Sequence, residues 1–143
     1  EAAIAILLSE ELQQQVRWNV LNLPIDDLDA IGNNEGNATD YYVNISATNT
    51  LVDLYVKADG DLFNSGGDSI GLGNETFGVS FNDSTVSNVS KFIMNTSYIL
   101  IGTGIEDNSI AYMKFYLDAP SSQAAGQYLN QLDFKAVREG EAP

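Results

Sequence analysis

The chain contains the stretch Ile110-Ala111-Tyr112-Met113-Lys114-Phe115-Tyr116-Leu117, in which apolar and aromatic residues are interrupted by a single charge. A near-continuous apolar run of this length is typical of a strand that is covered on both faces. We therefore predict a central β-strand over residues 110–117.

Shorter runs rich in β-branched and aromatic residues recur on both sides of this stretch, at intervals of about ten residues. Glycine- and asparagine-rich segments separate them, as expected of turns. Trp18 lies on the apolar face of the first run, which places it in the core. The runs predict strands at residues 16–21, 41–46, 51–56, 77–81, 86–94, 98–101 and 128–137, with 41–46 and 51–56 joined as a hairpin.

This spacing predicts an all-β protein with a β-sandwich or jelly-roll architecture. No linker or repeat divides residues 13–143, so we expect them to form one domain. Pro24 and the acidic run at residues 26–29 are expected to interrupt the chain after the first strand.

An apolar segment precedes this domain and consists of Ala2, Ala3, Ile4, Ala5, Ile6, Leu7 and Leu8. With period two both of its faces are apolar, which suits a strand that is covered on both sides or inserted into a groove. A helix is the alternative, because Ile4, Leu8 and Leu12 are four residues apart and the composition favours helix. We predict an extended arm over residues 1–12, which serves either as the first strand of its own sheet or as a strand given to another subunit.

The apolar segment is far shorter than the roughly 20 residues of a membrane-spanning helix. Its first residue is acidic, whereas a secretory signal begins with basic residues. We therefore expect a mature amino terminus from which a signal has been removed, a secreted or cell-surface location, and no membrane span.

The charge balance limits the partners of the chain. Six Lys and Arg stand against 20 Asp and Glu, which gives a net charge of −14. Such a surface repels phosphate backbones, so we expect no nucleic-acid partner. The chain has no Cys and no His, which excludes disulfides, thiol nucleophiles, His-dependent triads and His-ligated metals.

Acidic residues leave two kinds of chemistry open. The first is glycosidase chemistry, for which the carboxylate pairs Glu106–Asp107 and Asp59–Asp61 could supply the two acids. Both pairs are expected in loops, where no apolar pocket would raise the pKa of one acid. We therefore expect no enzyme and no cofactor. The second is Ca²⁺ binding, because two acidic clusters could supply oxygen ligands. The alternative interpretation is that these clusters form a solvated acidic surface. These candidates are Asp59, Asp61, Asn64 and Asp68, with a second cluster at Asp26, Asp27 and Asp29.

Six Asn-x-Ser/Thr triplets are present, where about two would be expected by chance. Turn-rich β-proteins favour these residue types in any case, but four of the six cluster between residues 74 and 97. We predict N-linked glycans, and hence an extracytoplasmic chain, at Asn37, Asn44, Asn74, Asn82, Asn88 and Asn95.

Several runs together resemble secreted archaeal β-sandwich surface proteins, a group that includes thread and bundling-pilus subunits and is similar to the biofilm fibre subunit TasA. The runs are Trp18-Asn19-Val20-Leu21, Asn49 to Lys57, Phe115 to Pro120, Ala124 to Tyr128 and Phe134-Lys135-Ala136. The resemblance covers most of residues 16–137, and its motifs are turn and strand signals.

In those filaments each subunit lacks a strand and receives the amino-terminal arm of its neighbour. The resemblance implies that this chain is a structural subunit of an extracellular glycosylated filament that polymerises with itself through residues 2–8. The alternative is a surface-layer or adhesion module that folds alone and binds Ca²⁺, glycans or other cell-surface proteins.

Overall fold

β-Strands make up nearly all of the regular structure in the computed structural model, which describes residues 1–143. The helical segments are α1 (Glu10–Gln13) and the 3₁₀ turn η1 (Leu72–Asn74). The predicted all-β class is confirmed. The strands are β1 (Ala3–Leu8), β2 (Val16–Val20), β3 (Ile25–Asp29), β4 (Tyr41–Thr48), β5 (Val52–Ala58), β6 (Leu62–Phe63), β7 (Ser69–Ile70), β8 (Glu75–Phe81), β9 (Phe92–Ile93), β10 (Ile99–Ile105), β11 (Ser109–Ala119), β12 (Gly126–Asn130) and β13 (Leu132–Arg138).

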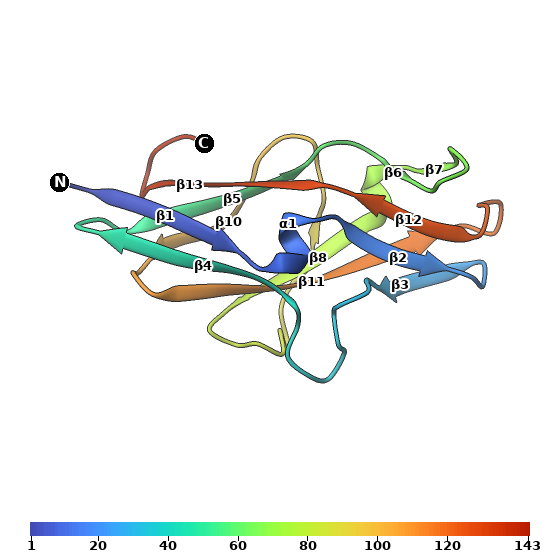
Figure 1. Cartoon of the computed structure of the whole chain (residues 1–143), viewed down its shortest axis with the longest axis horizontal. Helices are drawn as coiled ribbons and strands as arrows, with labels where there is room; N and C mark the ends of the chain where they lie inside the picture. Colours follow the sequence, from blue (N-terminus) through green and yellow to red (C-terminus); the bar gives the residue numbers. More distant parts are fainter.

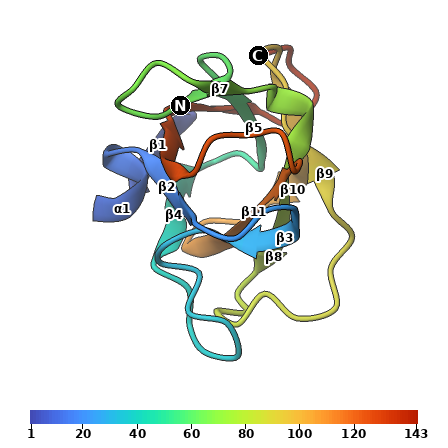
Figure 2. The same cartoon turned by 90° about the vertical axis from the view of Figure 1, so that its right-hand side faces the viewer.

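Two layers of strands face each other along the length of the molecule (Figure 1). One layer is a six-stranded sheet in the order β1-β4-β11-β8-β9, with β3 also paired to β11. The second layer consists of two smaller sheets placed end to end, β10-β5-β13 and β2-β12-β6-β7. The end-on view in Figure 2 shows the two layers enclosing the core between them. This arrangement is the predicted β-sandwich.

β11 is the central strand, as the stretch 110–117 predicts. One of its edges pairs first with β4 and then with β3, and its other edge pairs with β8. Its odd-numbered side chains face the core, where Met113 and Phe115 are fully buried. Phe115 meets Tyr41 of β4 edge to face, with 5.0 Å between ring centroids, and Trp18 of β2 is also fully buried, as predicted.

The predicted hairpin of residues 41–46 and 51–56 is wrong. β4 pairs with β1 and β11, whereas β5 pairs with β10 and β13, so the two strands belong to different layers. Asn49 adopts a positive φ of 59° in the connection between them. Because both strands carry an apolar face, the chain gains more by placing them across the core from each other than side by side.

Two other strand predictions also need correction, and one strand was not predicted. Most of residues 86–94 form a loop, and only β9 is a strand. Residues 128–137 are divided at Gln131 into β12 and β13, which lie in different sheets. The acidic run at residues 26–29 belongs to β3, which pairs with β11 while its carboxylates remain exposed.

The amino-terminal segment is not a separate arm in this structure. β1 pairs antiparallel with β4 of the same chain, from Ala3 opposite Thr48 to Leu8 opposite Val43. The helical alternative is confined to the single turn α1 that follows. Residues 1–12 therefore pack against the domain of residues 13–143, because Ile4, Ile6 and Leu8 contact its core.

We expect Phe115→Ala to lower the free energy of unfolding by about 3–5 kcal/mol, because it leaves a cavity beside Tyr41 in the centre of the core. Phe63→Ala is the matched control, since Phe63 is half exposed and its truncation is expected to change stability by less than about 1 kcal/mol. Urea unfolding followed by tryptophan fluorescence measures both. Equal effects would contradict the placement of the core.

Candidate functional site

β1 occupies the edge of the six-stranded sheet. It pairs with β4 on one side, and no strand pairs with its other side. Figure 1 shows it running beside β4 with the amino terminus at the outer end. An edge strand with free backbone N–H and C=O groups is a template for pairing with another chain.

The two faces of β1 differ in burial. Ile4, Ile6 and Leu8 are half-buried and pack on the core. Leu7, on the opposite face, is 64% exposed although it is a large apolar residue, and Ala3 and Ala5 beside it are also exposed. The sequence predicts a strand covered on both sides, but within one copy of the chain only one face is covered.

A short connection carries the chain from β1 to β2 in the opposite layer. The Ser9 hydroxyl accepts a hydrogen bond from the Tyr42 backbone N–H at 3.1 Å, and Ser9 N–H donates to the Tyr42 carbonyl at 2.8 Å. The Gln13 side chain donates to the Leu8 carbonyl at 2.8 Å, and Leu12 is buried. Residues 9–15 thus connect β1 to β2 and are themselves anchored to β4.

None of the six predicted glycosylation asparagines is buried. Four are exposed: Asn37, Asn82, Asn88 and Asn95. Asn44 and Asn74 are partly covered. Asn44 is the register partner of Leu7, so both side chains project from the same outer face of the sheet.

The candidate Ca²⁺ ligands are spread along their loop rather than gathered around one point. Asp59 accepts a hydrogen bond from the Gln131 N–H, and Asp61 accepts one from the Leu72 N–H. Asn64 and Asp68 are paired with each other at 3.1 Å. The structure contains no group of three or more acidic side chains arranged to hold a metal ion. These residues stabilise turns by accepting backbone hydrogen bonds.

The carboxylate pairs considered for glycosidase chemistry lie in exposed turns. Asp107 accepts a hydrogen bond from the Ala47 N–H at 2.8 Å, and its neighbour Glu106 lies at the rim of a shallow pocket of about 320 Å³. Asp59 and Asp61 are each engaged by backbone groups, as described above. Neither pair is enclosed by apolar side chains.

One carboxyl group is perturbed by burial, and sequence reasoning did not find it. Glu75 at the start of β8 is fully buried, and Asn130 of β12 donates to its Oε1 at 2.6 Å, which links the two layers. Burial raises the pKa of Glu75 to about 8, although the bond from Asn130 opposes the shift. Glu75 lines none of the three pockets, so it has no access to a substrate in solution.

A second polar cluster missed by the sequence analysis lies on the outer face of β11. Lys114 is buried there, and its ammonium group lies 3.2 Å from a Glu35 carboxylate oxygen. The Tyr116 hydroxyl donates to the other Glu35 oxygen at 3.3 Å. In the sequence, this cluster is marked only by Lys114, which is the single charge within an otherwise apolar strand.

Comparison with family models and with curated proteins finds no match. Among solved structures, the chain is similar to a family 123 glycoside hydrolase from Clostridium perfringens, at 14% identity and a TM-score of 0.45, over 98% of this chain and 25% of that one. It is also similar to a family two carbohydrate esterase from Cellvibrio japonicus, at 10% identity and a TM-score of 0.29, over 100% of this chain and 36% of that one. The chain thus spans about a quarter to a third of these proteins.

None of the helices has the length and apolar character that crossing a bilayer requires.

We expect the free energy of unfolding to fall as pH rises from about 4.5 to about 8. In this range Glu75 ionises readily in the unfolded chain, where its pKa is near 4.5, but resists ionisation in the core. The slope contributed by Glu75 reaches at most about 1.4 kcal/mol per pH unit. Denaturant unfolding at several pH values measures it.

Glu75→Gln should remove this contribution, whereas the exposed control Glu106→Gln should retain it. An unchanged slope in Glu75→Gln would show that the Glu75 carboxyl is not the group responsible.

Proposed function

We propose that the chain is a structural subunit of an extracellular filament, in which β1 of one copy occupies the place beside β4 in the next copy. The observation that carries this proposal is the position of β1. It lies at a sheet edge, pairs with β4 alone, and is connected to β2 in the opposite layer through residues 9–15.

β1 is hydrogen-bonded to only one other strand, so its departure would break a single strand pairing. The seat beside β4 is the same in every copy, so a second copy of β1 makes the same six register pairs and the same contacts of Ile4, Ile6 and Leu8. Exchange of an identical element between copies is a low-cost route to association. Partial burial of these three side chains contributes roughly 1 kcal/mol each.

One-way exchange, in which each copy gives β1 to the next copy, produces a chain of subunits, whereas reciprocal exchange between two copies would give a closed pair. The donated surface, β1, and the accepting surface, the edge of β4, are different parts of the molecule, so the contact is head to tail. Head-to-tail contacts generate open filaments when the rotation between neighbours does not close a ring.

Occupation of the β4 edge is required in either arrangement. Without β1, the backbone of β4 and the core residues Val43 and Ile45 would face water, which favours aggregation. The fold therefore needs a strand at this place, but the strand can come from the same copy or from a neighbour. We propose no catalytic role for the chain.

The proposal includes N-linked glycans at the exposed asparagines and a location outside the cell. Glycans are bulky and hydrophilic, and the four exposed sites lie in loops. A glycan on Asn44 would stand beside Leu7 and cover the apolar outer face of β1.

Paired cysteines test the exchange directly, because the natural chain has none. Ala5 and Ser46 are exposed register partners on β1 and β4. In the double variant Ala5→Cys/Ser46→Cys we expect oxidation of concentrated protein to give a ladder of disulfide-linked oligomers on a non-reducing gel, and filaments by electron microscopy. Ala5→Cys alone should give dimers at most.

An oxidised double variant that contains only internal disulfides, with no oligomers at any concentration, would overturn the filament proposal. It would favour a module that folds and acts alone.

The glycan sites are tested by expressing the chain through the secretory route of an N-glycosylating host and measuring site occupancy by mass spectrometry. We expect occupancy at Asn37, Asn82, Asn88 and Asn95, each lost when that asparagine is replaced by Gln. Asn49→Gln is a matched control, since Asn49 is exposed but starts no triplet. Empty sites at all four positions would contradict the prediction.

A further inference from the structure

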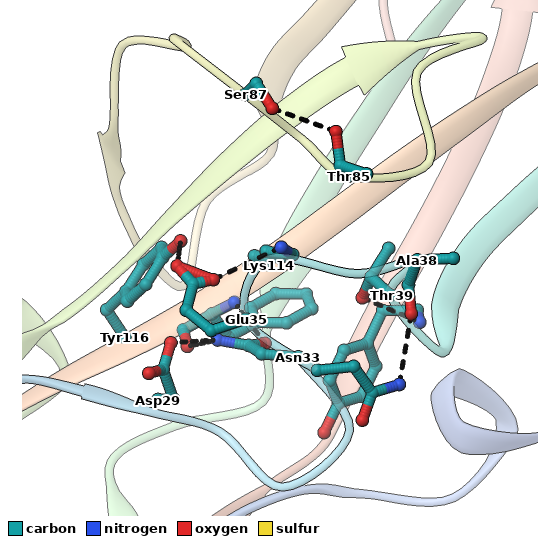
Figure 3. Close-up of polar contacts among 12 residues, drawn as sticks. Asp29, Asn33, Glu35, Ala38, Thr39, Thr85, Ser87, Lys114 and Tyr116 are labelled. Atoms are coloured by element: carbon teal, nitrogen blue, oxygen red, sulfur yellow. Dashed lines mark hydrogen bonds and ion pairs between the residues drawn. The ribbon is translucent and has the colours of Figure 1, made fainter.

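The largest pocket of the molecule lies on the outer face of the six-stranded sheet. Its volume is about 460 Å³, within the range of small-molecule sites. The floor is formed by Lys114 and Tyr116 of β11, one wall by Glu35 in the β3–β4 loop, and the other wall by Thr85 to Val89 in the β8–β9 loop. Figure 3 shows Glu35, Lys114 and Tyr116 on one side and Thr85 and Ser87 across from them.

Lys114 is a buried cation with unused hydrogen-bonding capacity. Its side chain is only 2% exposed, and its ammonium group makes one hydrogen bond, to Glu35. An ammonium group has three N–H donors, so two of them have no protein acceptor. Buried donors without acceptors are costly. A ligand that brings acceptor oxygens into the pocket would remove this cost.

The loop that forms the second wall is held close to the sheet by unusual backbone features. Gly78 lies opposite Lys114 in the register of β8 and β11, and a Cβ at Gly78 would lie 2.5 Å from the Val89 side chain. Val86 is buried and adopts a φ of +49°. A β-branched residue in this region is strained, and such strain is concentrated at binding and catalytic sites.

The charge on the pocket lining differs from that of the whole molecule. Two of the six cationic residues of the chain, Lys91 and Lys114, line the pocket, against one acid, Glu35. Lys91 lies 4.0 Å above the Tyr116 ring and 3.1 Å from Asp27. Asp83, next to the pocket, already accepts three hydrogen bonds from Thr85 and Ser87. Lys91 is thus paired with Asp27 outside the lining, which leaves Lys114, with its two unused donors, as the cation open to a ligand.

The remaining lining groups suit a ligand with several hydroxyl groups. Thr85 and Ser87 present hydroxyls, which bond each other at 2.8 Å. These groups both donate and accept hydrogen bonds. Lys114 with its open donors, together with the hydroxyls of Thr85 and Ser87, matches a molecule that combines a single carboxylate with hydroxyl groups.

We propose that this pocket binds a sugar acid, with the carboxylate of the ligand on Lys114 and its hydroxyls on the β8–β9 loop. The site is formed by β11, the β3–β4 loop and the β8–β9 loop and does not include β1. It therefore does not depend on strand exchange, and either proposal can fail alone.

The test uses the full chain, produced without glycans, and glucuronate as the probe. We expect a saturable interaction with a Kd of about 1 mM, measured by NMR titration, with shifts at Thr85, Ser87 and Lys114. Glucose and acetate are the matched probes that lack the carboxylate and the hydroxyls, respectively. Each should bind at least tenfold more weakly than glucuronate.

Two variants test the role assigned to the cation. Lys114→Met preserves length and burial but removes the charge, and binding should fall at least tenfold. Lys57→Met is the control, because Lys57 stacks on Tyr98, which lies away from the pocket. Glu35→Gln removes the carboxylate that competes for Lys114, so it should bind glucuronate several-fold more tightly.

Tighter binding in Glu35→Gln distinguishes a binding site from a structural ion pair, whose loss would not improve affinity. Absence of saturable binding, equal binding of acetate or glucose, or unchanged binding in Lys114→Met with intact fold would each overturn the proposal.

Discussion

The structure depends on the alternation of side chains along β11. Its odd-numbered residues form the middle of the core, and its even-numbered residues point to the outer face of the six-stranded sheet. Because β11 pairs with β4, β3 and β8, a slip of one residue in its register would exchange the two sets and expose Phe115 while burying Asp118. The same alternation that builds the core therefore places Lys114 and Tyr116 together on the opposite side, beneath the two loops that cover them.

The sequence was sufficient to predict the elements whose residues are determined by local pattern. The β-class, the central strand at 110–117 and the buried Trp18 follow from alternation and apolar runs. The layer to which each strand belongs depends on contacts between distant residues, and this explains the error at residues 41–56. Tyr41 meets Phe115, 74 positions later, and nothing in the short turn at Asn49 indicates that the chain crosses the core there.

The outer-face cluster shows a different limit of sequence reasoning. Lys114 stands out as the single charge of its strand, but its partner Glu35 comes from a polar loop 79 positions earlier. The Gly78–Val89 approach that encloses them is likewise formed by residues that carry no charge. A local pattern therefore marks one member of the cluster and leaves the others indistinguishable from ordinary loop residues. Glu75 and Asn130 are a similar case, because each is an ordinary polar residue until the two layers bring them together.

The amino-terminal strand connects the sequence hypothesis with the structure. β1 pairs with β4 of its own chain. In the proposed filament, pairing with a neighbour would use the same register and the same apolar contacts. The balance between the two would then be set by concentration, by the connection at residues 9–15 and by repulsion between subunits. A net charge of −14 per copy opposes close approach, and dissolved salt screens that repulsion over about 10 Å at 0.1 M. β1 is held by apolar side-chain contacts and backbone hydrogen bonds, and dissolved salt does not screen these contacts as it screens the repulsion between charges. Assembly through β1 is therefore expected to be favoured where the ionic strength is high, which is also where an acidic surface remains soluble.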